Sequence, residues 1–443
     1  EIVFGDWSSD VCSSDLAYSE ALRLIELCLQ LMPGNILFTY VKAWIEHKSG
    51  TDSKASLSKA MSCTIDYAFP KRAEWFAIFS HALSVNENDF KAHHLFGNFW
   101  YDKKQYDLAE QHWKTSIRHQ PLFAASLRNL AIVSYNHNND PEAAYSYIKS
   151  AFLLDSQSAR LLLEQDQLAA MSGVSVSARR QALLRHLQLV EERDDLYLEL
   201  ITLHNLSGEF DLALQLLKKR KFHPWEGGEG KVIGQFRISL ISKALGCLAT
   251  NDPHCAITLL NESLSPPDTI GEAKLPLAQD QDVLYLLGCA WAMLGQTKQA
   301  MLYFEKASEG ELQVGEAFFY NDTQADKVLY QGLAWARLGQ RNKAEKLFRS
   351  LLSYGTENLD KKTQFDYFAV SFPHLSNWNI DGDKRNRVHC LFLQGLGLLG
   401  LEKTEEAREC LQAALLKDPA HQSAKLHFDI IANYKIINIL LVK

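Results

Sequence analysis

Apolar and small residues recur at helical spacing along much of the chain, and residues 96–121 show the pattern most clearly. Gly97 and Ala109 are small, and Trp113 supplies a large aromatic side chain one helical turn after Ala109. This arrangement predicts two antiparallel helices that approach each other at the small residues, with aromatic side chains filling the groove beside them. The following residues carry a second copy of the pattern, displaced by 34 positions, from Gly97 to Ala131.

A self-similarity of about 34 residues with this pattern is typical of tetratricopeptide (TPR) arrays, in which each repeat is one helical hairpin. Residues 156–192 fit the pattern poorly and are expected to hold a degenerate repeat, and an extra helix is expected at residues 73–83. The sequence predicts an all-α, right-handed superhelical solenoid of about nine or ten TPR-like helical hairpins, with loop insertions along its second half. Further copies have small residues in the matching slots: Ala43 and Ala55, Gly288 and Ala300, Gly332 and Ala344, Gly395 and Ala407.

Residues at the expected turns agree with this spacing. Asp140-Pro141 and Asp252-Pro253 each place an acidic N-cap before a proline at the first helical position. Leu294-Gly295 and Leu338-Gly339 each end the first helix of a hairpin, because glycine tolerates the left-handed backbone conformation at that position. Each pair therefore predicts the turn between the two helices of one hairpin.

The same patterns divide the chain into segments. Residues 1–16 contain a repeated Ser-Ser-Asp and are interpreted as a non-native leader, so the chain is expected to be a fragment. An N-terminal TPR array is expected at 17–221, a glycine-rich insertion loop at 222–236 and a C-terminal TPR array at 237–435. The apolar tail, residues 436–443, is expected to end a capping helix, and the alternative is a second non-native remnant like the leader.

Three insertions interrupt the second half, at residues 222–234, 266–282 and 354–383. Insertions between repeats form loops on one face of an array, and that face is often the binding face. The segments FHPWEGGEGKV, GEAKLPLAQDQDVLYLLGCA and DYFAVSFPHL, with YAFPKRAEWFAIFSHAL near the best-formed repeat, resemble an uncharacterised bacterial family over residues 17–430. The resemblance implies a TPR array joined to an N-terminal β-sandwich similar to galactose-mutarotase-like carbohydrate-binding domains. That sandwich is expected to be missing from this chain.

Composition limits the classes of partner. The formal net charge of −7 over 443 residues gives no basic face for nucleic acid. No run of 18 apolar residues is found, so we expect no transmembrane helix and no membrane partner. Eight cysteines are too few for a disulfide framework. Several occupy small repeat slots and are interpreted as free thiols in a reducing, cytoplasmic compartment, namely Cys28, Cys247, Cys289 and Cys410.

The glycine-rich loop is the first candidate ligand site. Trp225 offers an aromatic face, and the carboxylates of Glu226 and Glu229 flank it, which would suit the hydroxyl groups of a sugar ring. The alternative is that Trp225 plugs the groove of the array while the glycines let the chain turn. No Gly-Lys-Ser/Thr follows the glycines, so the loop is not a phosphate-binding loop.

A second set of candidate ligand residues lies in the last insertion and comprises Trp378, Asp381, Asp383 and Arg385. Paired carboxylates can hydrolyse glycosides if they flank the scissile bond, but nothing in the sequence places these two in a closed pocket. The spacing faintly resembles a calcium loop without its full set of ligands. Arg385 could instead pair with the two aspartates and order the loop, and the aspartates could simply be solvated.

Other catalytic or metal-binding patterns are not found. The pairs His93-His94 and His389-Cys390 are adjacent on expected helices and point about 100° apart, so they cannot easily chelate one ion. No Cys-x-x-Cys and no Gly-x-Ser-x-Gly occur. We expect no metal, no cofactor and no enzymatic activity.

The sequence therefore favours a non-catalytic TPR scaffold that binds a protein or peptide partner, as part of a bacterial carbohydrate-handling protein. The alternative is a module that binds saccharide directly, or an accessory region of a glycoside-processing enzyme. Exposure of Trp225 and Trp378 side by side in one concavity would favour the alternative, and burial of both would argue against it.

Overall fold

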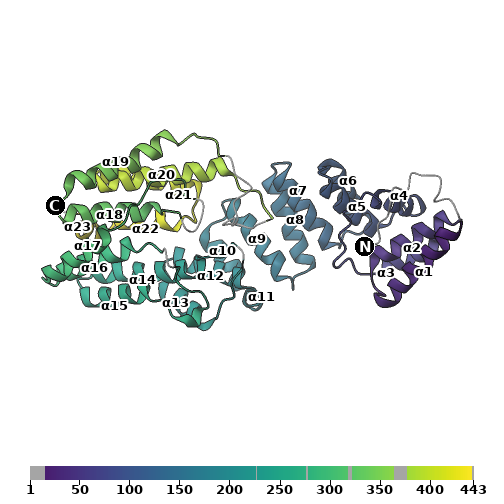
Figure 1. Ribbon diagram of the computed structural model, residues 1–443, viewed down its shortest axis with the longest axis horizontal. Coiled ribbons are helices and arrows are strands. Elements are labelled where there is room, and N and C mark those ends of the chain that lie inside the picture. Colours follow the sequence, from purple (N-terminus) through teal and green to yellow (C-terminus); the bar gives the residue numbers. More distant parts are fainter. Residues whose placement is uncertain (1–14, 226, 276–277, 318–321, 364–376, 442–443) are drawn as a thin grey trace. The chain divides into compact units, whose positions relative to one another are not determined.

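The chain folds into helices joined by turns and loops (Figure 1). The computed structural model describes residues 15–225, 227–275, 278–317, 322–363 and 377–441, and within these ranges it contains no strand. Contacts divide the chain into two compact units, Glu1–Leu161 and Leu162–Lys443. The array boundary that the sequence places after residue 221 lies within the second unit.

The first unit contains three regular hairpins, α2 with α3, α5 with α6 and α7 with α8, and an extra helix, α4, where one was predicted. Its helices are α1 (Asp15–Leu31), α2 (Ile36–Lys48), α3 (Lys54–Ser62), α4 (Trp75–Val85), α5 (Phe90–Asp102), α6 (Tyr106–His119), α7 (Ala124–Asn136) and α8 (Pro141–Leu154).

The second unit begins within α9 (Ala159–Met171) and continues through short helices in the region predicted as degenerate, α10 (Val176–Leu184) and α11 (Leu187–Glu192). Regular hairpins follow: α12 (Asp194–Leu206) with α13 (Phe210–Lys219), α14 (Lys231–Ala249) with α15 (Pro253–Leu264), α16 (Gln281–Met293) with α17 (Thr297–Ser308), α18 (Ala325–Arg337) with α19 (Arg341–Glu357), and α20 (Gly382–Gly400) with α21 (Thr404–Lys417). The last helices are α22 (Gln422–Ala432) and α23 (Tyr434–Leu440).

The small residues of the repeat pattern lie where the two helices of a hairpin meet. A Cβ atom added to Gly97 would lie 2.4 Å from Nε1 of Trp113, so the aromatic ring occupies the space that the glycine leaves. In the second unit the same contact joins Gly288 to Phe304 and Gly332 to Phe348. The prediction of an all-α array of TPR-like helical hairpins is confirmed within each unit.

The predicted turn residues also have the expected roles. The side chain of Asp140 accepts a hydrogen bond from the backbone N–H of Ala143 at 2.9 Å, and Asp252 caps α15 in the same way. Gly295 and Gly339 have φ angles of +71° and +79°, the left-handed conformation in which glycine is unstrained.

Helix α14 differs from its prediction in two respects. It begins at Lys231, so the irregular loop predicted at 222–234 ends earlier than expected. With a mean hydropathy of 1.3 it is also long and apolar enough to cross a membrane by length and composition. However, 56% of its apolar window is buried, and the helix packs on α13 and α15, so we interpret it as a core helix of the array.

The interpretation of Cys247 as a free thiol is wrong. Cys247 near the end of α14 forms a disulfide with Cys255 at the start of α15. The tight turn between these helices brings the two Cα atoms to 6.0 Å, within the range that a disulfide requires. Cys28, Cys289 and Cys410 have free thiols, as predicted.

Candidate functional site

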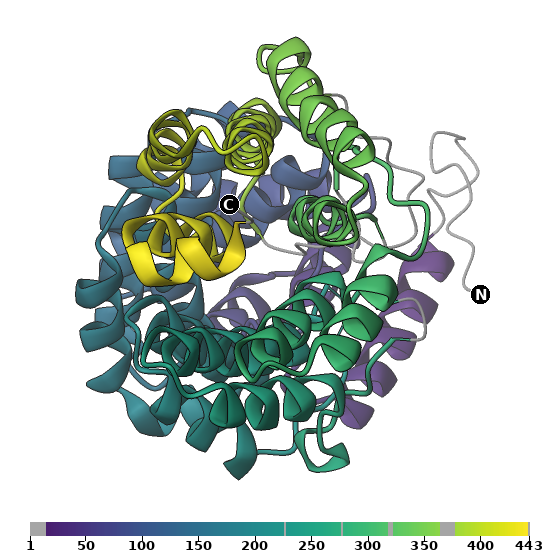
Figure 2. The same cartoon turned by 90° about the vertical axis from the view of Figure 1, so that its left-hand side faces the viewer.

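The second unit has an inner face formed by its first helices. These helices contact one another, α12 with α14, α16 with α18 and α18 with α20, and each also packs against the second helix of its own hairpin. We define the inner face by Gln235 of α14, Tyr285 and Cys289 of α16, and Tyr330 and Arg337 of α18. The C-terminal helices, yellow in Figure 2, lie on the inner side of the curve that the teal and green helices form.

Helix α22 is joined to this face by a network of side-chain amides, of which Gln235 and Asn205 are buried. Gln422 of α22 and Gln235 of α14, which are 187 positions apart, exchange two hydrogen bonds of 2.8 and 2.9 Å through their side-chain amides. Asn205 of α12 donates to Gln235 at 2.9 Å, and Ser239 donates to Asn205 at 2.7 Å. Because each amide has a partner of matching polarity, the network can be buried without leaving these donors unpaired.

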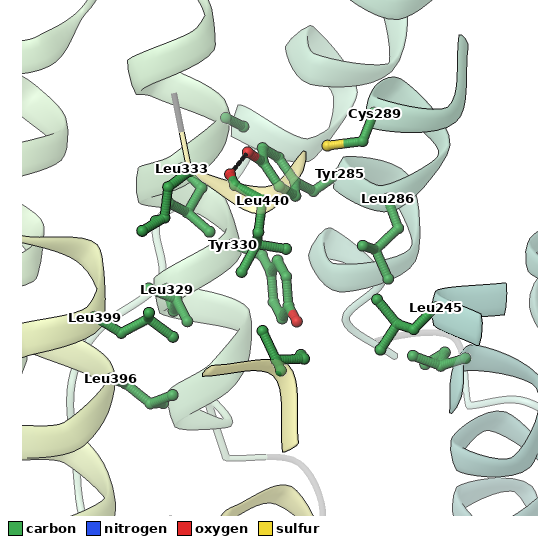
Figure 3. Close-up of a cluster of buried hydrophobic side chains, with 14 of the residues drawn as sticks. Leu245, Tyr285, Leu286, Cys289, Leu329, Tyr330, Leu333, Leu396, Leu399 and Leu440 are labelled. Atoms are coloured by element: carbon green, nitrogen blue, oxygen red, sulfur yellow. Dashed lines mark hydrogen bonds between the residues drawn. The ribbon is translucent and has the colours of Figure 1, made fainter. Parts of the chain in front are cut away.

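Helix α23 places apolar side chains against the same face. Ile436, Leu440 and Leu441 are buried, whereas Tyr434 and Lys435 on the opposite side are exposed. Figure 3 shows Leu440 between Tyr285 of α16 and the side chains of α18. The tail therefore completes a hydrophobic cluster that extends across α14, α16, α18 and α20.

The main chain of the tail is held by polar groups of the inner face. The hydroxyl of Tyr285 donates a hydrogen bond to the carbonyl oxygen of Leu440 (Figure 3), and the guanidinium of Arg337 donates to that of Ile439. The thiol of Cys289 lies 3.8 Å from the same Ile439 oxygen. The last carbonyl groups of a helix have no N–H partner within that helix. The inner face therefore supplies the partners that the end of α23 lacks.

A small cavity lies beside α22. It has a volume of about 160 Å³, and its walls come from the turn between α12 and α13, from α14 and from α22. Lys425 and Asp429 of α22 line it, together with Phe210 and Ile238. This volume falls below the 300 Å³ or so at the lower end of the range for drug-sized ligands, so the cavity is not a separate small-molecule site.

Charged groups on the first helices neutralise one another. Asp282 at the start of α16 accepts hydrogen bonds from Arg237 of α14 and Lys327 of α18. Burial opposes ionisation of Asp282, but Lys327 and Arg237 together hold its pKa below the usual value. The carboxylate is therefore charged and paired, which suits a structural link between three helices better than proton transfer.

The glycine-rich loop folds back on the second insertion. Trp225 is half-buried, and a Cβ atom added to Gly228 would lie 2.3 Å from the indole, so the ring packs on its own loop. Glu272 accepts hydrogen bonds from the backbone N–H groups of Gly230 and Ile233 at 2.6 and 2.8 Å, which caps the start of α14. Glu229 is exposed. Sequence reasoning missed the role of Glu272, because nothing local links it to a helix start some 40 positions earlier.

Trp378 does not lie beside Trp225 in an open concavity. Its side chain is 2% exposed, and its indole N–H donates to the side chain of Gln167 in α9 at 3.1 Å. A buried indole offers no face to a sugar ring, so we remove Trp378 from the candidate ligand residues. Glu226 lies outside the described residues.

The two aspartates of the last insertion bind backbone groups. Asp381 is the N-cap of α20 and accepts a hydrogen bond from the N–H of Lys384 at 2.9 Å. Asp383 accepts from the N–H of Thr363, also at 2.9 Å. These contacts order the start of α20, and a ligand contact of either aspartate stays a prediction.

Arg385 donates to the carbonyl oxygen of Ala317 at 3.4 Å, and burial lowers its pKa. Among the described residues no group of three or more histidine, cysteine or acidic side chains has the geometry to hold a metal ion.

Comparison with known proteins adds little to this geometry. No model of a known protein family matches the chain, so its resemblance to the bacterial family stays a prediction. The crystal structure of the APC/C hetero-tetramer Cut9-Hcn1 is similar at 13% sequence identity and a TM-score of 0.23, covering 96% of this chain and 89% of that chain. At this TM-score the likeness supports no further conclusion, and the fold rests on the helices and their packing.

Proposed function

We propose that the chain is a non-catalytic scaffold that binds a polypeptide partner on the inner face of its second unit. One observation carries the proposal. The inner face already holds a polypeptide segment, because Tyr285 and Arg337 donate hydrogen bonds to backbone carbonyl groups of α23. Extended concave surfaces of repeat proteins serve this kind of binding.

The inner face has the chemistry that binding to main chain requires. Tyr285 and Arg337 present hydrogen-bond donors in apolar surroundings. A hydrogen bond from a charged group such as the Arg337 guanidinium contributes about 1.5–3 kcal/mol. The buried charges near it are paired, as at Asp282, so the face as described offers donors and apolar area rather than a general acid or base. Such a surface favours peptide recognition over catalysis.

Selection of displayed random peptides on the full chain tests the proposal. The selection uses the full chain carrying Leu440→Asp, so that α23 does not compete for the face, and we expect enriched peptides whose affinity falls about 10- to 100-fold when Arg337→Ala is added, since one charge-assisted hydrogen bond is lost. Arg349→Ala is the matched control and should leave the affinity unchanged, because Arg349 lies on α19, the second helix of its hairpin, with its side chain 65% exposed. Absence of enriched peptides, or equal affinity of both variants, would contradict the proposal.

The saccharide alternative rests on Trp225 and Glu229, the accessible part of the glycine-rich loop. A glycan array probed with the full chain and with Trp225→Ala separates it from peptide binding. Saccharide binding that disappears in Trp225→Ala, without enrichment of peptides, would favour the alternative and its place in carbohydrate handling.

A further inference from the structure

We propose that α23 is an intramolecular ligand of the inner face, and that it occupies the place where a short apolar helix of a protein partner binds. The partner therefore binds only when the tail leaves. This inference rests on the proposed function and adds to it the chemistry of the partner and the means by which access is controlled.

The apolar contacts define the partner's side chains. Ile436 and Leu440 are four positions apart on one side of α23 and are buried, at 8% and 0% exposure, in the cluster formed with α16 and α18. Leu441 follows them and is also buried. Positions four apart lie on one face of a helix, so a partner helix needs large aliphatic residues at this spacing near its C-terminal end.

The polar contacts define how the partner's helix ends. The polar contacts of Tyr285, Cys289 and Arg337 with the tail are made to carbonyl oxygens, at Ile439 and Leu440. Hydrogen bonds to backbone carbonyl groups do not depend on which side chains the bound helix carries. Arg337 is a cation at the C-terminal end of a helix, where the helix dipole is negative. Any aliphatic helix that ends at this position would satisfy the same three groups.

The connection between α22 and α23 allows the tail to leave alone. Only Asn433 separates the two helices, and its side chain caps α23 by accepting from the N–H of Lys435 at 3.1 Å. Helix α22 has its own anchors, the amide pair of Gln422 with Gln235 and the fully buried His427. Helix α23 has seven residues, and isolated helices shorter than about 12 residues are marginal in water. Its structure therefore depends on the inner face.

A labelled peptide of residues 433–441 (NYKIINILL) tests the inference on the full chain. In Leu440→Asp the buried leucine becomes a carboxylate, which should release the tail and leave the face open to the probe. We expect the probe to bind Leu440→Asp at least about tenfold more tightly than the wild type, in which the tethered tail competes at high effective concentration. Leu416→Asp is the matched control, because Leu416 is 79% exposed on α21 and should behave as the wild type.

Two further measurements complete the test. Adding Arg337→Ala to Leu440→Asp should lower the affinity for the probe about tenfold or more, whereas adding Arg349→Ala should leave that affinity unchanged. If Leu440→Asp does not fold, a protease site inserted between Ala432 and Asn433 allows cleavage of the folded chain, after which the probe should exchange with the cleaved tail.

Three results would overturn the inference. The first is equal binding of the probe to the wild type and Leu440→Asp, and the second is no binding to either open form. The third is a concentration-dependent dimer of the wild type that is lost in Leu440→Asp, since the occupant would then be a second copy of the chain. If the probe fails while selected peptides bind in an Arg337-dependent manner, this inference fails and the proposed function stands.

Discussion

Two buried tyrosines on the inner face should respond in opposite ways to loss of their hydroxyl groups. Tyr285 and Tyr330 belong to the same cluster, are 0% and 1% exposed, and have ring centroids 5.8 Å apart. The hydroxyl of Tyr285 donates to the carbonyl of Leu440 and accepts from Arg337 at 3.3 Å. The hydroxyl of Tyr330 has no hydrogen-bond partner within the described part of the chain. Substitution by phenylalanine removes only the hydroxyl in each case and leaves the ring in place.

The expected magnitudes follow from these partners. Tyr285→Phe leaves a buried carbonyl of the tail without its donor, which should lower the free energy of unfolding by about 1–3 kcal/mol. Tyr330→Phe removes an unpaired buried hydroxyl, so the free energy of unfolding should stay the same or rise by up to about 1 kcal/mol. The two variants should therefore differ by about 2 kcal/mol although their chemical change is identical.

Native-state hydrogen exchange of the amides in α16 and α18 measures this difference within the second unit alone. Faster exchange of residues 436–441 in Tyr285→Phe would locate the loss at the tail. Equal effects of the two substitutions, or a larger loss of stability in Tyr330→Phe, would refute the reasoning. The hydroxyl of Tyr330 would then have to form a stabilising hydrogen bond.

Two other predictions concern the repeats themselves. Burial lowers the pKa of His94 to about 3. Because the unfolded residue has a pKa near 6.5, it binds a proton below that pH while the folded residue stays neutral, so stability is lost as pH falls. Urea unfolding at pH 7 and pH 5 should show a loss of about 2 kcal/mol from this group. His94→Gln should reduce the loss, and substitution of the exposed His254 by glutamine should not. Gly332→Ala places a Cβ atom 2.3 Å from the ring of Phe348 and should cost about 1–3 kcal/mol by overpacking. In Gly246→Ala no atom lies within 4 Å of the added Cβ, so the substitution should stabilise the fold by about 0.5–1 kcal/mol through helix propensity. Thermal unfolding measures both variants, and stability changes of the same sign would contradict the repeat pattern.

The repeat architecture could be predicted because its signals are local. The spacing from Gly97 to Trp113 reflects a contact within one hairpin, and helical periodicity determines that contact. The N-caps at Asp140 and Asp252 act over three residues. Such features need no knowledge of how successive hairpins accumulate curvature.

The contacts that define the inner face could not be predicted in this way. Gln235 meets Gln422 only because several hairpins curve far enough to bring α22 back to α14, and the sequence carries no measure of that curvature. The burial of Trp378 likewise depends on α9, more than 200 positions earlier in the chain. A polar residue such as Arg337, on the side of a first helix away from its hairpin partner, is the kind of signal that could have indicated the site.

The proposed inner face of the second unit binds polypeptide, and α23 occupies it in the free chain. Hydrogen exchange of the full chain with and without a selected peptide tests this most directly. We predict that residues 434–441 are protected in the free chain and lose protection when the peptide binds, while the amides of α16 and α18 stay protected. Unchanged protection of residues 434–441 at saturating peptide would contradict the account.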